Sequence, residues 1–158
     1  MKHLEIEMKT LLNKDEYQRL QDHFSGVTPI TQKNYYLDTP DFYLRKHKIA
    51  MRIRTFENSA ELTIKIPQKV GNMEYNQDLS LEEANHCLKE CKLPQGMILD
   101  ELTSRGLSTS GWVVLGCLTT VRYEKQTPIG LMALDQSQYF DIVDYELELE
   151  VEDGNQGS

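Results

Sequence analysis

Charged and apolar side chains alternate along several segments of this sequence, and each segment carries charges of mostly one sign. Residues 4–9 read Leu-Glu-Ile-Glu-Met-Lys, residues 51–54 read Met-Arg-Ile-Arg, and residues 145–151 read Tyr-Glu-Leu-Glu-Leu-Glu-Val. Successive side chains of a β-strand point to opposite faces, so each segment would place its charges on one face and its apolar side chains on the other. Strands of this kind predict a sheet with two chemically different sides.

The same alternation, together with turn residues between the segments, predicts eight strands. They lie near residues 4–9, 32–38, 49–56, 60–66, 73–79, 112–123, 128–136 and 139–151. A helix is expected over Lys14–Phe24 with Asn13 as its N-cap, a second begins at residues 80–83 with a capping-box pattern, and a third covers about 96–106. Mostly sequential strands with few helices predict an α+β fold: an eight-stranded antiparallel β-barrel with helices packed outside.

Length, charge and cysteine content narrow the class of protein. The chain has 158 residues, and we expect a single domain over residues 1–158. Lys and Arg number 17 against 25 Asp and Glu, a formal net charge of −8 that argues against a protein that coats nucleic acid. No apolar run approaches the roughly 20 residues that span a bilayer. Three cysteines fit a reducing compartment, so we expect a cytoplasmic protein. From the acidic net charge and the short apolar runs we expect neither a nucleic-acid partner nor a membrane partner. The sequence carries no signal for the oligomeric state.

If the strands close into a barrel, their charged faces can line its bore while the apolar faces pack outward under the helices. The bore would then hold the cations Lys9, Arg52, Arg54, Lys65 and Arg122 and the carboxylates Glu5, Glu7, Asp135, Glu146, Glu148 and Glu150. On opposite walls, the basic set could bind a polyphosphate and the acidic set could hold a divalent cation that bridges to it. The alternative interpretation is that these charges face water on a half-exposed sheet.

The order of these motifs resembles that of the CYTH superfamily, also called the triphosphate tunnel metalloenzymes. The matching segments are Glu5-x-Glu7-x-Lys9, residues 34–39, residues 51–54, residues 62–65, Val121-Arg122, Leu134-Asp135 and residues 145–150. They are similar, in order, to the ExExK signature, the YxDT…LRxR stretch, the strand with a tunnel lysine, and the later arginine, aspartate and ExE positions. At position 51, Met replaces the usual Leu. The resemblance covers residues 4–151 and is closest to short, stand-alone Firmicute-type members.

The resemblance implies a triphosphate tunnel in which Mg²⁺ or Mn²⁺ supports hydrolysis of a small triphosphate, inorganic or organic, such as thiamine triphosphate. Phosphate oxygens would be bound by Lys9, Arg52, Arg54, Lys65 and Arg122. Metal would be bound by Glu5, Glu7, Asp135, Glu146, Glu148 and Glu150. The catalytic set would be Glu7, Lys9, Arg52, Arg54 and Lys65. Thr63 and Tyr36 are further candidates for orienting these groups, and Glu74 could either face the tunnel or lie on a solvated hairpin.

Several alternatives stay open at this point. Members of the superfamily usually continue through another helical segment, and residues 1–158 are consistent with a CYTH-like domain that lacks it. The reaction could instead be that of a class IV-type adenylyl cyclase, or the chain could be a non-catalytic module that binds polyphosphate or nucleotide. The histidines His3, His23, His47 and His86 are scattered without the spacing of a zinc site, and we interpret them as surface or packing residues.

Overall fold

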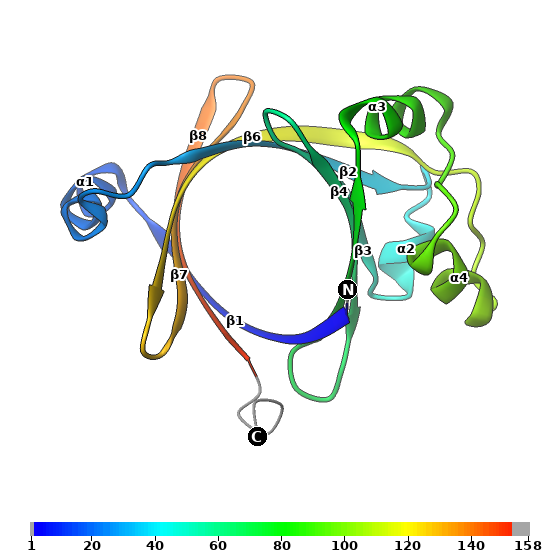
Figure 1. Ribbon diagram of the computed structural model, residues 1–158, viewed down its shortest axis with the longest axis horizontal. Coiled ribbons are helices and arrows are strands. Elements are labelled where there is room, and N and C mark those ends of the chain that lie inside the picture. The colour runs from blue at the N-terminus through cyan, green and yellow to red at the C-terminus, as the bar shows by residue number, and fades with distance from the viewer. Residues whose placement is uncertain (1, 153–158) are drawn as a thin grey trace.

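The computed structural model describes residues 2–152, and its main feature is a closed barrel of antiparallel strands (Figure 1). The strands are β1 (Lys2–Leu12), β2 (Ile30–Asp38), β3 (Ala50–Thr55), β4 (Ala60–Pro67), β5 (Asn72–Leu79), β6 (Val113–Thr127), β7 (Gly130–Tyr139) and β8 (Ile142–Glu152). Around the barrel they follow the order β1-β5-β4-β3-β2-β6-β7-β8, and β8 pairs with β1 to close it. The predicted eight-stranded antiparallel barrel is confirmed.

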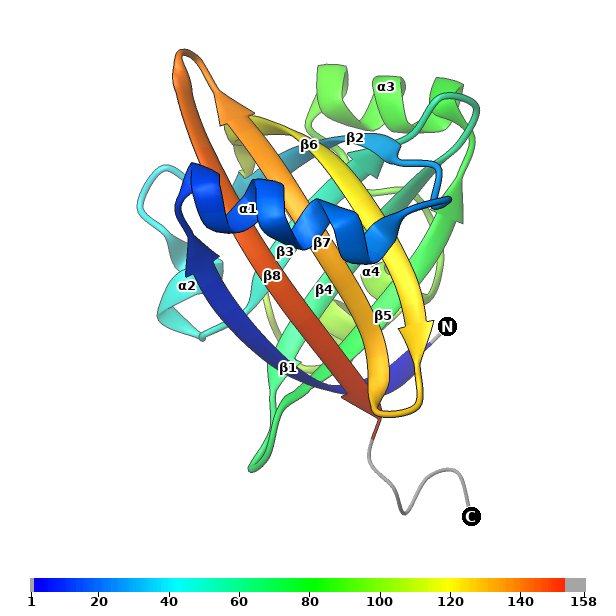
Figure 2. The ribbon, with the colours of Figure 1, turned by 90° about the vertical axis from the view of Figure 1, so that its left-hand side faces the viewer.

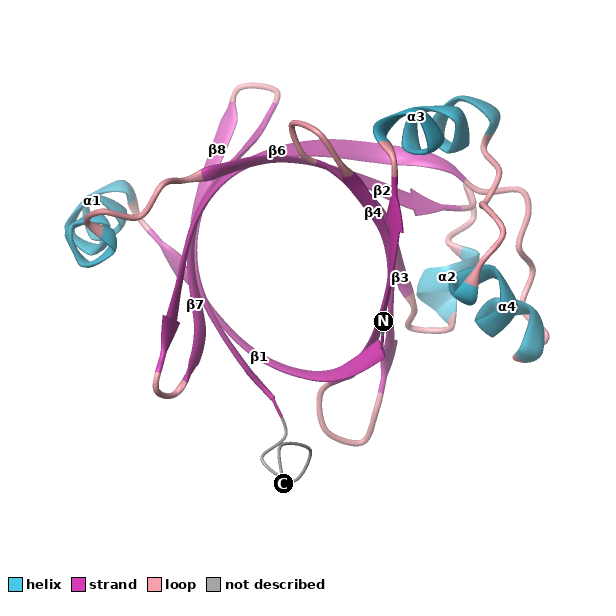
Figure 3. Ribbon diagram, in the orientation of Figure 1, coloured by secondary structure: helices cyan, strands magenta, loops and turns pink. Residues whose placement is uncertain are grey.

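The helices lie outside the barrel on two sides (Figure 3). On one side, α1 (Lys14–Gln21) continues into the short 3₁₀ helix η1 (Asp22–Phe24), and α1 crosses the outer face of β7 and β8 (Figure 2). On the other side lie α2 (Tyr43–Lys46), α3 (Leu81–Glu90) and α4 (Met97–Ser104), which contact strands β2 to β5. No helix within residues 2–152 is long and apolar enough to cross a membrane.

The helix starts follow from local hydrogen bonding. The side chains of Asn13 and Ser80 each accept a hydrogen bond from the backbone N–H three residues later, and the carboxylates of Glu16 and Glu83 accept one from the cap N–H. The predicted Asn13 cap and the capping box predicted at residues 80–83 are therefore confirmed, and Asn13 with Glu16 forms a second capping box. The helix expected over residues 14–24 differs in its last turn, which is 3₁₀ rather than α.

The hydrophobic core lies between the barrel wall and the helices, not inside the barrel. The larger cluster contains the outward side chains of Ile53, Leu62 and Ile64, which are fully buried against residues of α3 and α4. A smaller cluster with Tyr17 and Phe24 lies beneath α1 and η1. Each buried Leu or Ile stabilises the fold by roughly 1.5–3 kcal/mol. Because this burial occurs outside the barrel, the strands can close without an apolar interior, and the bore is available for polar side chains.

Asp38 organises the connection between β2 and α2. Its side chain is buried, and its carboxylate accepts hydrogen bonds from the backbone N–H groups of Thr39 (2.7 Å), Leu44 (2.8 Å) and Arg45 (3.1 Å). The first N–H groups of a helix have no partner within the helix, so a carboxylate at this place supplies one. Asp38 therefore contributes to the fold, although it belongs to one of the segments that resemble the family signature.

We expect Asp38→Ala to lower the free energy of unfolding by about 2–3 kcal/mol, because the change leaves buried N–H groups without an acceptor. Urea denaturation followed by circular dichroism measures this loss. The control is Asp144→Ala, an exposed aspartate of β8, which should change stability by less than about 0.5 kcal/mol. Equal stability losses in the two variants would contradict this role for Asp38.

Candidate active site

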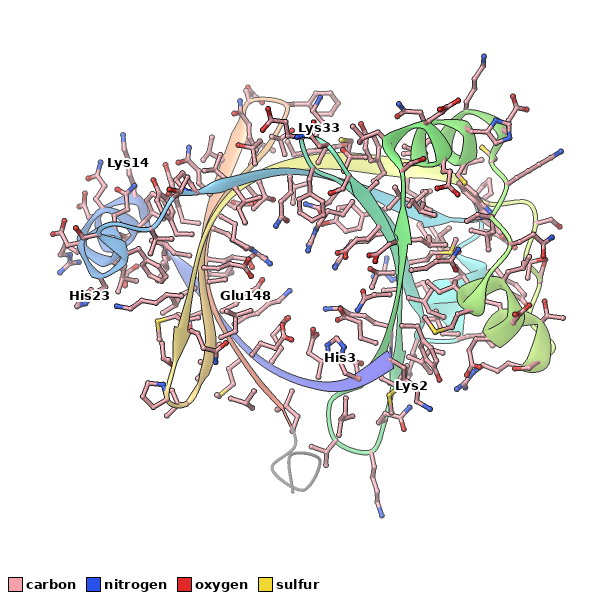
Figure 4. All side chains as sticks on the ribbon, in the orientation of Figure 1. Lys2, His3, Lys14, His23, Lys33 and Glu148 are labelled. Atoms are coloured by element: carbon pink, nitrogen blue, oxygen red, sulfur yellow. The ribbon has the colours of Figure 1, made fainter. Side chains whose placement is uncertain are left out.

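The bore of the barrel contains a cavity of about 240 Å³ that receives side chains from all eight strands. Its lining includes every predicted site residue, namely Glu5, Glu7, Lys9, Arg52, Arg54, Lys65, Arg122, Asp135, Glu146, Glu148 and Glu150. Figure 4 shows Glu148 directed into this interior, whereas Lys14 and His23 lie outside the barrel. The alternative of charges on a solvated sheet face is therefore wrong for these strands.

The predicted metal ligands fall into two groups of three carboxylates. One group consists of Glu5, Glu7 and Glu150, and the other of Asp135, Glu146 and Glu148. Within each group, one oxygen from each carboxylate lies within 4.8 Å of the other two. Strand register explains the grouping, since β8 lies between β1 and β7, with Glu150 opposite Glu7 and Glu146 opposite Asp135. Carboxylate oxygens at this spacing fit a hard divalent cation such as Mg²⁺ or Mn²⁺.

Three of the predicted phosphate-binding cations lie among these carboxylates. The pairs are Lys65 with Glu5 (2.7 Å between Nζ and Oε1), Arg122 with Asp135 (two hydrogen bonds of 2.7 Å) and Lys9 with Glu7 (3.2 Å between Nζ and Oε1). The expected segregation into opposite walls is therefore only partly correct. Opposite charges attract, and Lys and Arg side chains are long enough to reach acids on their own strand, on a neighbouring strand or, for Lys65, two strands away.

Arg52 and Arg54 form the part of the cavity wall that does match the expectation. Both lie on β3, which β5 and β4 separate from β1. Among the described residues Arg52 has no ion pair within 4.0 Å, and its buried Nε has no hydrogen-bond partner. Arg54 donates from Nε to Asn34 Oδ1 at 2.6 Å and lies 3.8 Å from Glu61. Burial and the neighbouring Arg52 lower the pKa of Arg54 to about 10. The guanidinium groups of Arg52 and Arg54 are therefore suited to bind an anion.

Sequence comparison identifies the fold family. The profile of the CYTH domain matches residues 3–158. The chain belongs to the CYTH family. The Bacillus subtilis protein YjbK, named as a candidate triphosphatase, is 36% identical over 156 residues, which cover 98% of this chain and 80% of YjbK. Metal dependence is general in the CYTH family.

Two solved structures show the same CYTH barrel. A candidate adenylate cyclase from Bacillus halodurans is 37% identical, with a TM-score of 0.89 over 98% of this chain and 84% of that one. A candidate adenylyl cyclase from Hippeastrum, described as having a dominant triphosphatase activity, is 22% identical, with a TM-score of 0.79 over 99% of this chain and 82% of that one. The second likeness concerns the fold alone.

Burial, together with neighbouring carboxylates, raises the pKa of two carboxyls in the CYTH bore. Burial raises the pKa of Glu148, and the nearby Glu7 adds to this effect against the opposing charge of Arg122. Burial, with the charges of Glu5 and Glu74, raises the pKa of Glu150 to about 7. Holding these groups ionised costs free energy, and a bound cation would offset that cost.

The raised pKa of Glu150 predicts a pH dependence of stability. An unfolded Glu loses its proton near pH 4.5, whereas folded Glu150 keeps it until about pH 7, so the folded protein binds more protons between these values. The metal-free protein should therefore lose stability as the pH rises through this interval. Glu150→Gln should remove that part of the loss, and urea denaturation in EDTA at both ends of the interval measures it. Glu57→Gln, in an exposed turn, is the control, and identical pH profiles for wild type and Glu150→Gln would contradict the assignment.

The three further candidates, Thr63, Tyr36 and Glu74, lie in different positions relative to the cavity. Thr63 is buried and donates a hydrogen bond to Asn76 at 2.7 Å, and it does not line the cavity. Tyr36 lines the cavity with 42% of its surface exposed. Glu74 lines the cavity and is buried, so of its two interpretations the one facing the tunnel is correct.

Sequence reasoning missed several side chains of this interior, among them Asn34, Glu61 and His3. Asn34 and Glu61 line the cavity on both sides of Arg54. His3 is not a surface residue, because its ring points into the barrel (Figure 4), with Nε2 3.7 Å from Glu150. The signal was the two-residue period itself, since His3 lies two positions before Glu5 on the same face of β1.

Proposed function

We propose that this chain is a metal-dependent triphosphatase that hydrolyses a linear triphosphate inside its barrel, either inorganic triphosphate or a small organic triphosphate such as thiamine triphosphate. The observation that carries the proposal is the presence, in one enclosed bore, of the guanidinium pair Arg52 and Arg54 and of two carboxylate groups. The name of YjbK, which is 36% identical, supports it.

Binding would use the cationic side chains in two ways. Arg52 and Arg54 offer planar N–H forks that match phosphate oxygens, and the unpartnered Nε of Arg52 gains an acceptor when an anion enters. Lys9, Lys65 and Arg122 already have carboxylate partners, and they would turn toward phosphate once a divalent cation neutralised those carboxylates. Substrate and metal would therefore enter the bore cooperatively.

Hydrolysis would proceed by in-line attack on the terminal phosphorus. A divalent cation held by the carboxylate groups supplies charge neutralisation and lowers the pKa of water. The oxygen of water bonds to the terminal phosphorus while the bond from that phosphorus to the bridging oxygen breaks, which gives orthophosphate and a diphosphate that keeps the bridging oxygen. Arg52 and Arg54 would stabilise the charge that develops on the phosphoryl oxygens, and the carboxylate of Glu7 would accept a proton from the attacking water.

Adenylyl cyclisation is the second candidate, because the Bacillus halodurans relative is named as a candidate cyclase. The reaction requires recognition of adenine next to the triphosphate. Among the residues that line the cavity, Leu118 is the one aliphatic side chain and Tyr36 the one aromatic side chain. A lining this polar offers little surface for a base to stack on, which favours hydrolysis.

A substrate panel tests the proposal. The protein is incubated with tripolyphosphate, thiamine triphosphate or ATP, each with Mg²⁺ or Mn²⁺, and orthophosphate, pyrophosphate and cyclic AMP are measured. We expect metal-dependent release of orthophosphate and none in EDTA. Cyclic AMP with pyrophosphate from ATP would identify a cyclase instead. Tight metal-dependent binding of tripolyphosphate without turnover of any substrate would identify a non-catalytic binding module.

A further inference from the structure

A histidine and two carboxylates meet where β1 pairs with β5. His3 is directly opposite Glu74 in the strand register, and Glu5 lies two residues further along β1 on the same face. One donor atom from each of these three residues lies within 4.8 Å of the others. His3 Nε2 is 4.0 Å from Glu74 Oε1, and the ring points into the barrel (Figure 4). These three side chains differ from the two carboxylate groups because they include a nitrogen donor.

Two buried atoms of this cluster lack hydrogen-bond partners. The side chain of Glu74 is 9% exposed, and its Oε2 accepts no hydrogen bond. The Nδ1 atom of His3 is also buried without a partner. Buried polar atoms are almost always satisfied in folded proteins, so Glu74 Oε2, which has the Lys65 ammonium at 3.6 Å but no hydrogen bond, is open to a further cationic partner.

The charges around the cluster indicate that this ligand is a cation. The ammonium of Lys65 faces Glu5 at 2.7 Å, Glu74 at 3.6 Å and Glu7 at 3.7 Å, so one positive charge serves three carboxylates. Glu150 adds a fourth carboxylate, with its Oε1 3.7 Å from the same Nε2 atom of His3 that faces Glu74. If a cation took the oxygens of Glu5 and Glu74, Lys65 would be released from both carboxylates, in agreement with its proposed turn toward phosphate.

We propose that His3, Glu5 and Glu74 form a cation site that takes divalent first-row transition metals, such as Mn²⁺ or Zn²⁺, in preference to Mg²⁺. Imidazole nitrogen is a good ligand for these transition metals, whereas Mg²⁺ prefers oxygen ligands and retains its water. The inference rests on the proposed function for the presence of metal in this bore, but not for hydrolysis. If so, the imidazole of His3 determines which divalent metal this site prefers.

The test uses Mn²⁺ as the probe and protein without an affinity tag. Electron spin-echo envelope modulation of bound Mn²⁺ should show coupling to an imidazole nitrogen in the wild type. His3→Gln should abolish this coupling and weaken Mn²⁺ binding by about tenfold or more, a loss typical when the shell around a metal is changed. Mg²⁺ affinity, measured by competition, should stay unchanged. The matched control is His23→Gln, an exposed histidine of η1 outside the barrel, which should retain the coupling.

The proposal is overturned if wild-type Mn²⁺ shows no nitrogen coupling, or if His3→Gln retains both the coupling and the affinity. A second measurement needs no variant: Zn²⁺ should shift the ring ¹⁵N resonances of His3 in the wild type, and unshifted resonances would also overturn it. Failure of the proposed function gives a different result, because protein that releases no phosphate from any triphosphate can still show the nitrogen coupling.

Discussion

Arg52→Ala should reduce kcat/KM for tripolyphosphate by roughly 10²–10³-fold, about 2.7–4 kcal/mol of transition-state stabilisation. Among the described residues this guanidinium has no ion pair within 4.0 Å, and its Nε is buried without a partner, so its interaction free energy is available to the substrate. The charge on the phosphoryl oxygens increases toward the transition state, so we expect kcat to fall along with affinity. Steady-state kinetics at saturating metal measures both parameters.

The matched control for this change is Arg45→Ala, which removes an exposed arginine of α2 on the outside of the barrel. That variant should retain the kinetics of the wild type. Arg52→Lys should recover only part of the activity, because lysine restores the charge but not the planar fork. Wild-type kinetics in Arg52→Ala would show that the substrate does not reach this part of the bore, and the proposed binding mode would then be incorrect.

Glu148→Gln should raise the metal concentration needed for half-maximal activity by about 10–100-fold. The side chain is nearly buried and belongs to the carboxylate group with Asp135 and Glu146. Its carboxylate also lies 3.6 Å from Arg122 and 3.8 Å from Lys9. The change replaces a carboxylate by a neutral amide of the same shape, so the side chain loses its negative charge and attracts the metal less. Activity against metal concentration, with Mg²⁺ and with Mn²⁺, measures the shift.

The same variant should not lose stability in the absence of metal, because burial raises the pKa of Glu148 and its ionised form is therefore costly. Thermal unfolding in EDTA near neutral pH should give a Tm equal to or above that of the wild type. The control is Glu82→Gln on the exposed surface of α3, which should alter neither property. A wild-type metal requirement in Glu148→Gln would remove this residue from the metal site.

Much of the interior could be predicted because a strand has an exact two-residue period. Once Glu5 and Glu7 are placed on one face of β1, Lys9 must follow them, and the same argument holds for Arg52 and Arg54 on β3. The caps of α1 and α3 were equally predictable, because a capping box needs only residues three positions apart. These are local properties, and the structure agrees with each of them.

The pairing of the charges could not be predicted. Lys65 contacts Glu5 across 60 positions of sequence, because β4 and β1 both neighbour β5. Nothing local to either strand specifies that proximity. The position of His3 has the same origin, since it faces Glu74 only because β1 pairs with β5.

The amino-acid sequence by itself determined which residues share a strand face, which sign of charge each face carries, and where the first and third α-helices begin. Only the tertiary structure decided which charges meet, that the carboxylates divide into two groups, and that Arg52 is left without an ion partner among the described residues. The reason is physical: side-chain alternation follows from the backbone geometry of each strand, whereas distances across the bore depend on the order in which eight strands close.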